Sequence, residues 1–138
     1  MGTPWNDAYR VRIDSLDRQH RKLFELINEL DALDAQHTAP VVCGAKMTLL
    51  IRHLREHFRT EEDLFAKYGY PEGAIHRRHH DSFVRNLTDF KERVDGGSLT
   101  LSKEIRQFIG DWLVNHIVKI DMRYSPFLVE AMAAARSA

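Results

Sequence analysis

Apolar residues recur at alternating intervals of three and four along four stretches of this chain, and each stretch carries ionisable side chains on the same stripe. These intervals follow one face of an α-helix, so they predict four amphipathic helices. Ionisable side chains on such a face are rare, because their burial without a partner carries a large free-energy cost. The residues that break this rule are His20, His57, Glu61, His76, His80, His116 and Asp121. A metal ion is the simplest partner they could share, and five imidazoles with two carboxylates can surround two ions.

Capping residues and glycines place the ends of these helices. The first helix should begin after Asp14 or Ser15, because either side chain can cap a helix N-terminus. Residues 37–40 separate it from the second helix, which should end in a left-handed cap at Gly69, and glycines 96–97 should end the third. The four stripes consist of Leu16, His20, Leu23, Ile27 and Leu30; of Met47, Leu50, Leu54, His57, Glu61 and Leu64; of His76, His80, Phe83, Leu87, Phe90 and Val94; and of Leu101, Ile105, Phe108, Trp112, His116 and Ile120.

A proline interrupts the chain after the fourth stripe. The residue before a proline is biased away from the helical conformation, so Pro126 predicts a break near residues 124–125. Residues 127–135 would then form a short fifth helix.

The predicted helices are joined by connections of a few residues and imply one architecture. Four amphipathic helices with short connections favour an all-α, up-down-up-down four-helix bundle. Residues 1–13 are expected to form an extended arm held by Trp5 and Ile13. The length of the chain fits one domain over residues 1–138.

Composition excludes several classes of partner. Lys and Arg together number 20, as do Asp and Glu, so the net charge of zero argues against a nucleic-acid or anionic-membrane footprint. The lone Cys43 cannot form an internal disulfide, which favours a reducing compartment. No apolar run approaches the ~20 residues of a membrane span. We therefore expect a cytoplasmic protein without a membrane span.

The spacing of the candidate ligands makes a specific local prediction. His57 and Glu61 are four residues apart, as are His76 and His80, and this interval places two side chains on one helix face. Asp121 follows His116 by five residues instead, so in a regular helix it would lie roughly 140° around the axis from that histidine. We therefore expect a π-type widening, or an early helix end, near residues 118–121.

The donor atoms restrict the choice of metal. Imidazole nitrogen with carboxylate oxygen suits iron, zinc, copper or nickel, and two carboxylates among seven ligands suggest bridging. The segment His53–His57 also fits a zinc-peptidase pattern, but that reading would remove His57 from the set and leave the other candidates unexplained. His37, His53 and His79 have no place in the ligand scheme, and Glu62 is expected to face outward. No Glu-x-x-His pair occurs, which argues against the ferritin-like di-iron class.

The same residues resemble the hemerythrin family, in particular its bacterial single-domain members, over nearly the whole chain. The matching segments are Trp5-Asn6-Asp7, Ile13, Asp17-Arg18-Gln19-His20, Leu23-Phe24, His57-Phe58-Arg59-Thr60-Glu61-Glu62, Tyr70-Pro71, His76-Arg77-Arg78-His79-His80, Trp112-Leu113-Val114-Asn115-His116-Ile117 and Asp121. The resemblance implies a non-haem di-iron centre with an oxo or hydroxo bridge. It also implies one iron on His76, His80 and His116, a second on His20 and His57, and bridges from Glu61 and Asp121.

The resemblance also implies a function. It indicates reversible dioxygen binding for carriage, storage or delivery, with the ligand at an open position on one iron and no catalytic residue. The residues that match the family's apolar oxygen pocket are Leu23, Phe58, Trp112, Leu113 and Ile117. An oxygen or redox sensor, a di-iron peroxidase or nitric-oxide-handling enzyme, and a metal buffer remain alternatives, because they would share these ligands. An oxygen-consuming or signalling protein is the partner class that such functions suggest.

Overall fold

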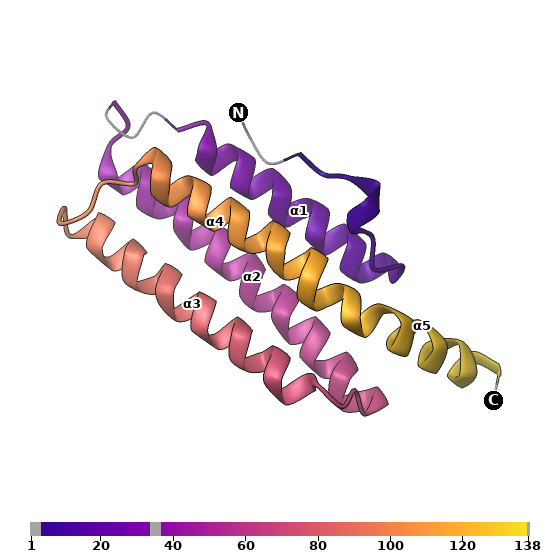
Figure 1. Ribbon diagram of the computed structural model, residues 1–138. Coiled ribbons are helices and arrows are strands. Elements are labelled where there is room, and N and C mark those ends of the chain that lie inside the picture. Colours follow the sequence, from indigo (N-terminus) through magenta and orange to yellow (C-terminus); the bar gives the residue numbers. More distant parts are fainter. Residues whose placement is uncertain (1–3, 34–36, 138) are drawn as a thin grey trace.

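Residues 4–33 and 37–137 are described by the structure, which is a computed structural model. Within these ranges the chain forms helices and no strand. The elements are η1 (Asp7–Tyr9), α1 (Asp14–Asp31), α2 (Pro40–Tyr68), α3 (Gly73–Asp95), α4 (Lys103–His116), η2 (Ile117–Asp121) and α5 (Met122–Ser137). Helices α1 to α4 lie side by side with alternating direction, which confirms the predicted four-helix bundle (Figure 1). None of the described helices combines the length and the hydropathy needed to cross a membrane.

Local chemistry explains the end of α2 and the start of α4, but not the start of α1. Gly69 caps α2 with a φ of 68°, as expected, because only glycine adopts this left-handed conformation without strain. The side chain of Ser102 accepts a hydrogen bond from the backbone N–H of Ile105 and caps α4. Helix α1 begins at Asp14 itself, and neither Asp14 nor Ser15 caps it, so the predicted start was wrong by one or two residues.

The N-terminal arm packs on the bundle through Trp5 and Ile13, as predicted for its described part; residues 1–3 lie outside the described ranges. The ring of Trp5 lies edge-on to Phe24 at 5.4 Å, and Ile13 is buried. The carboxylate of Asp17 accepts hydrogen bonds from the backbone N–H groups of Val11 at 2.8 Å and Arg12 at 3.2 Å. Asp17 is only 6% exposed, so these bonds hold the end of the arm against the start of α1.

Replacing Asp17 by alanine should lower the free energy of unfolding by about 1–3 kcal/mol, because the buried N–H of Val11 would lose its acceptor. The measurement is urea unfolding followed by circular dichroism. Asp14→Ala is the matched control, because Asp14 lies in the same turn but is exposed. Equal stability of the two variants would contradict the role of Asp17.

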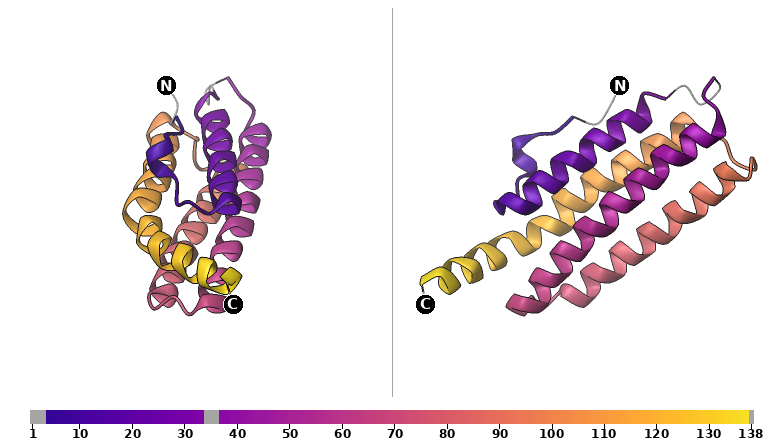
Figure 2. Two further views of the ribbon diagram at one scale, coloured as in Figure 1. Left: turned by 90° about the vertical axis from the view of Figure 1, so that its right-hand side faces the viewer. Right: turned by 180° about the vertical axis from the view of Figure 1, so that it is seen from behind.

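The predicted break at residues 124–125 is wrong, because α5 runs through Pro126 without interruption from Met122 to Ser137. Tertiary contacts outweigh the preference of the residue before Pro126 for a non-helical conformation. The hydroxyl of Ser125 donates to the carbonyl of Val11 at 2.7 Å, and Leu128 is fully buried. The arm and α5 therefore stabilise each other, and α5 extends beyond the end of the bundle in line with α4 (Figure 2).

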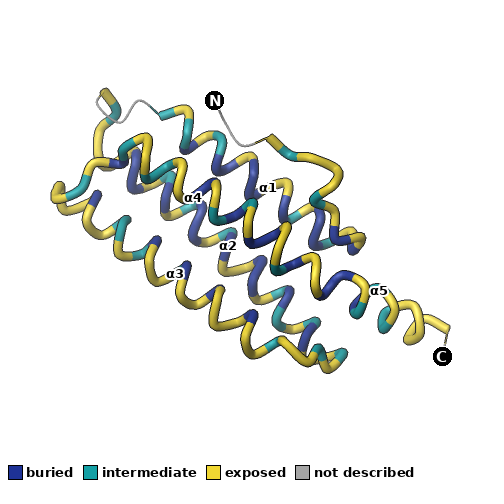
Figure 3. The backbone as a smooth tube through the Cα atoms, viewed as in Figure 1, coloured by how far each residue is buried: buried dark blue, intermediate teal, exposed yellow. Residues whose placement is uncertain are grey.

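Buried residues lie on the helix faces that meet inside the bundle, and the residues on the outer faces are exposed (Figure 3). Several positions of the predicted stripes are only half-buried or exposed, and at Phe108 and Leu64, for example, the following residue is buried instead. Phe108 is 46% exposed while Ile109 is buried, and Leu64 is only half-buried while Phe65 is buried. A helix with 3.6 residues per turn drifts away from an alternating three-four pattern, so the buried face shifts by one residue at these positions.

Candidate metal centre

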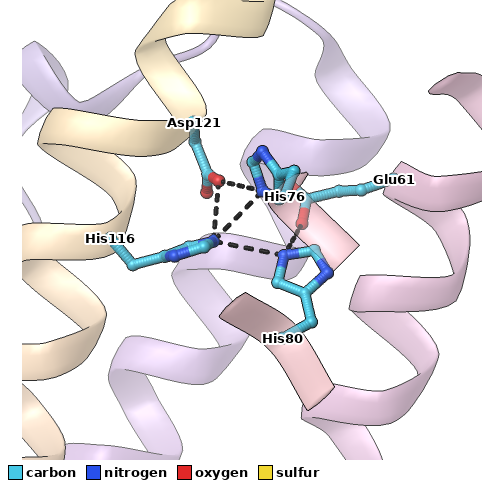
Figure 4. Close-up of side chains that lie close together, drawn as sticks. All are labelled: Glu61, His76, His80, His116 and Asp121. Carbon is cyan, nitrogen blue, oxygen red and sulfur yellow. Dashed lines mark hydrogen bonds and ion pairs between the residues drawn. The ribbon is translucent and has the colours of Figure 1, made fainter. Parts of the chain in front are cut away.

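All seven candidate ligands converge inside the bundle from four sides, and every one of these side chains is buried. Helix α1 supplies His20, α2 supplies His57 and Glu61, α3 supplies His76 and His80, and the α4–η2 segment supplies His116 and Asp121. Figure 4 shows five of these side chains directed toward one another.

The predicted π-type widening is confirmed, because η2 forms a π turn over Ile117–Asp121. The extra residue in this turn rotates Asp121 back toward the side of His116. One carboxylate oxygen of Asp121, Oδ1, lies 3.0 Å from Nε2 of both His76 and His116, and Oδ2 lies 3.1 Å from Nε2 of His20. Asp121 therefore contacts histidines from three helices.

The ligand atoms form two overlapping groups, within each of which all atoms lie within 4.8 Å of one another. The three-histidine group consists of Glu61, His76, His80, His116 and Asp121, and the two-histidine group consists of His20, His57, Glu61 and Asp121. Glu61 and Asp121 belong to both. Oε1 of Glu61 lies 3.3 Å from Nε2 of His57 in one group and 3.2 Å from Nε2 of His80 in the other. The two carboxylates therefore occupy bridging positions.

The chemistry of these donors fits a pair of cations. Nε2 of His116 lies 3.2 Å from Nε2 of both His76 and His80. Three ring nitrogens that face one another cannot all be satisfied by hydrogen bonds among themselves, but they could share a cation. Several buried atoms also lack a partner with hydrogen-bond geometry, namely both ring nitrogens of His20, Nε2 of His57, Oε1 of Glu61 and both carboxylate oxygens of Asp121. Buried polar atoms without hydrogen bonds are rare in proteins, and cations between these atoms would satisfy them.

Electrostatics keeps both carboxylates ionised. Burial would raise the pKa of Asp121, but the charge and hydrogen bonding of His116, with help from His20 and His76, hold it well below its usual value of 3.8. Burial and the charge of Asp121 likewise oppose ionisation of Glu61, yet the neighbouring histidines lower its pKa to about 2. Two negative charges are therefore available to neutralise cations.

Burial disfavours protonation of both His57 and His80, but the net pKa shifts of these two histidines have opposite directions. Burial lowers the pKa of His57 to about 3, since the charge of Glu61 offsets only part of that effect. Burial also opposes protonation of His80, but hydrogen bonds to Glu61 and Glu62 raise its pKa to about 9. Metal binding requires neutral imidazoles, so His80 must lose its proton when a cation binds.

Three side chains around the ligands were missed by sequence reasoning. Nδ1 of His57 lies 2.7 Å from Oε1 of Gln19, and the hydroxyl of Tyr124 donates to Oε2 of Glu61 at 2.5 Å. The prediction that Glu62 faces outward is wrong, because its Oε2 lies 2.9 Å from Nδ1 of His80. Gln19 and Glu62 are each adjacent to a ligand in sequence, and a polar residue at that position is the signal that could have identified them.

The predicted apolar pocket residues lie around the same ligands. Phe58 stacks on the ring of His80 at a centroid distance of 3.7 Å, and Trp112 stacks on that of His116 at 4.6 Å. The other three predicted residues, Leu23, Leu113 and Ile117, are fully buried in the main core cluster.

The histidines that were left out of the ligand scheme lie outside both groups. His37 and His79 are exposed. His53 is half-buried and Glu56 is exposed, so neither joins the buried cluster. The zinc-peptidase reading of His53–His57 therefore has no support in the geometry.

The fold and the site together define a helical-bundle domain with an internal cluster suited to cations. Residues 11–128 match the sequence model of the family described as "Hemerythrin HHE cation binding domain". The chain belongs to the hemerythrin family.

Named relatives agree with this family. The chain is 31% identical to a bacteriohemerythrin of Methylococcus capsulatus, over 90% of this chain and 95% of the relative. It is 36% identical to a hemerythrin-like protein of Naegleria gruberi, over 90% of this chain and 92% of the relative. A crystal structure of wild-type hemerythrin superimposes with a TM-score of 0.84 and 31% identity, and covers 91% of this chain and 96% of its own.

Proposed function

We propose that this protein binds dioxygen reversibly at a pair of iron ions held by the three-histidine and two-histidine groups. The observation that carries the proposal is their unequal composition around two shared carboxylates. Iron accepts imidazole and carboxylate ligands, and the iron pair would supply the electrons for reversible oxygen binding. Three imidazoles fill more of one coordination sphere than two imidazoles fill of the other, so the two-histidine position keeps room for a small ligand.

The shared carboxylates give the site two negative charges, and Tyr124 contributes a hydroxyl that stays protonated. Glu61 and Asp121 place two negative charges between the cation positions. Burial and the charge of Glu61 raise the pKa of Tyr124 well above 10.0, so its hydroxyl stays protonated. That hydroxyl donates a hydrogen bond to Glu61. The ionisable hydroxyl that contacts the ligand cluster is therefore a poor acid.

Apolar side chains pack around the candidate ligands. Leu23, Leu113 and Ile117 are fully buried, and Phe58 and Trp112 cover the faces of two ligand rings. We propose that these five residues form the oxygen pocket. An apolar lining limits access of water and protons, which favours reversible binding over oxidation of the metal.

Replacing Leu113 by asparagine should shorten the lifetime of the oxygenated form several-fold, because a polar amide of similar branched shape would admit water to the lining. The measurement is the decay of the visible absorbance in air-saturated buffer. Leu113→Met is the control, because it preserves the volume without adding a polar atom. Equal lifetimes of the two variants would argue against a pocket at this residue.

The proposed function is tested by metal content and a visible spectrum, recorded on protein reduced without oxygen, then exposed to air, then degassed. We expect two irons per chain and a colour that appears in air and fades on degassing. Rapid irreversible oxidation would favour an oxygen or redox sensor acting on a protein partner, or peroxidase chemistry. One zinc ion, or no metal, would overturn the proposal.

We also propose a cytoplasmic location. The lone Cys43 is buried and free, so it forms no disulfide, and a reducing compartment maintains a thiol in that state.

A further inference from the structure

Two ligand histidines have a side-chain partner on the ring nitrogen that faces away from the cluster, and no other ligand histidine has one within residues 4–33 and 37–137. Gln19 contacts Nδ1 of His57, and Glu62 contacts Nδ1 of His80. In both histidines Nε2 points into the cluster. A partner that accepts the Nδ1 proton leaves the lone pair on Nε2, which is the form that binds a metal.

The orientation of Gln19 follows from a chain of hydrogen bonds. The hydroxyl of Thr60 donates to the carbonyl of Glu56 at 3.0 Å, so its oxygen is left to accept. The side-chain amide of Gln19 donates to that oxygen at 3.1 Å, which directs its carbonyl oxygen toward His57. Gln19 is therefore a neutral acceptor for the Nδ1 proton of His57.

Glu62 supports His80 with a charge instead. Its Oε2 accepts from Nδ1 of His80 at 2.9 Å, and its Oε1 lies 3.6 Å from Nε of Arg77. Hydrogen bonds to an ionised acceptor are roughly twice as strong as those between neutral groups. A carboxylate on Nδ1 also makes Nε2 a better electron donor to a metal than a neutral amide does.

The difference in charge distinguishes the two metal positions. Glu62 supports a ligand of the three-histidine group, whereas Gln19 supports a ligand of the two-histidine group. The second histidine of the smaller group, His20, has a buried Nδ1 with no hydrogen-bond partner at all. The smaller group thus lacks an anionic support on either ring.

We propose that Glu62 and Gln19 are positioning residues whose difference in charge sets the order of metal occupancy, so that the three-histidine position fills first and releases its ion last. This inference rests on the proposed two-metal centre. It predicts that the protein forms a one-metal intermediate both when it binds and when it releases the two ions. In that intermediate His76, His80 and His116 hold the single ion.

Both positioning residues can be substituted without disturbing the core. Gln19 lines a groove of about 270 Å³ beside His57, and Glu62 lines a groove of about 990 Å³ beside His80. Glutamine and glutamate have nearly the same shape, so Glu62→Gln and Gln19→Glu exchange the charge with little change in packing. Gln19→Glu also removes the amide that donates to Thr60. Asp63→Asn is the control, because Asp63 is exposed and lines the larger groove without contacting a ligand.

The test measures the release of metal to an excess of chelator from protein loaded with ferrous iron without oxygen, and again from protein loaded with zinc. The wild-type protein should release two ions in two steps of one ion each. Glu62→Gln should accelerate the slow step about 10–100-fold, as removal of such supporting groups does elsewhere. Gln19→Glu should slow the fast step, and Asp63→Asn should change neither.

A second measurement separates positioning from a general loss of stability. In the zinc-loaded wild-type protein, nuclear magnetic resonance should show Nδ1 protons on both His57 and His80 that exchange slowly with solvent. In Glu62→Gln the signal of His80 should shift and that of His57 should stay, and Gln19→Glu should give the reverse. Unchanged signals in both variants would overturn the assignment.

Equal release rates for both ions in the wild-type protein and in Glu62→Gln would overturn this inference and leave the oxygen-binding proposal intact. A wild-type chain that binds no metal would overturn both.

Discussion

Replacing Glu61 by alanine should reduce the metal content from the proposed two ions per chain to one or none. Its carboxylate belongs to both ligand groups and approaches Nε2 of His57 and of His80 within 3.3 Å. Without the Glu61 carboxylate, both proposed metal positions lose an anionic ligand. The imidazoles must then hold the cations with one negative charge fewer nearby. The measurement is elemental analysis of purified protein together with its visible spectrum.

Asp63→Ala is the control for Glu61→Ala, since Asp63 lies two residues further along α2 but is exposed. A second comparison is His116→Ala, which should impair the three-histidine position alone because His116 is absent from the other group. Retention of two ions by both Glu61→Ala and His116→Ala would show that the ligand assignment is wrong.

Removal of the metal should have the second large effect, which is a loss of stability. A ligand that binds only the folded state stabilises it by about 4 kcal/mol when its free concentration is 1,000 times Kd. Because the ligands come from all four sides of the bundle, the unfolded chain offers no comparable site. Thermal unfolding with and without a chelator should therefore show a clearly lower Tm for the metal-free protein.

The metal-free protein should also depend on pH in a way that the metal-loaded protein does not. The pKa of His80 rises from 6.5 to about 9 on folding, so its contribution to stability is complete below pH 6.5 and is lost as the pH rises to about 9. A shift of this size corresponds to about 3 kcal/mol. His20, whose pKa is also raised, acts in the same direction, because hydrogen bonding and charge from Asp121 outweigh its burial.

At acidic pH the metal-free protein should lose stability because some groups have a lower pKa in the folded state than in the unfolded chain. The pKa of His57 falls from 6.5 to about 3 on folding, so protons favour the unfolded chain as the pH drops through that window. Glu61, with its pKa lowered from 4.5 to about 2, adds a further loss at lower pH. The metal-free protein should therefore be most stable near pH 6.5.

Metal binding changes the profile because a coordinated imidazole has no lone pair left for a proton. The stability of the loaded protein should stay level between pH 6.5 and about 9, the window in which the metal-free protein loses the contribution of His80. Urea unfolding at several pH values measures both profiles. A decline over this window that is equally steep with and without metal would contradict binding at His80.

Several features of the fold and the site could be read from the sequence because they depend on local spacing. Intervals of three and four determine which residues share a helix face, and Gly69 can end a helix wherever the chain needs a left-handed residue. The five-residue interval between His116 and Asp121 predicted the π turn for the same reason. The seven candidate ligands were recognisable because their chemistry conflicts with an apolar face.

Other features were decided only in three dimensions. The helix through Pro126 persists because Ser125 bonds to the carbonyl of Val11, 114 residues away in sequence. The support of His80 by Glu62 and the contact of Tyr124 with Glu61 likewise join different helices.

The sequence by itself determined the helical faces, the residue types gathered in the candidate metal centre and the family to which this chain belongs. Only the tertiary structure decided which atoms of Glu61 and Asp121 face which histidines, and that one ligand ring is supported by a charge and another by a neutral amide. The physical reason is that spacing along a helix places a residue on a face. How that face is rotated and what it meets depend on the packing of every other helix in the bundle.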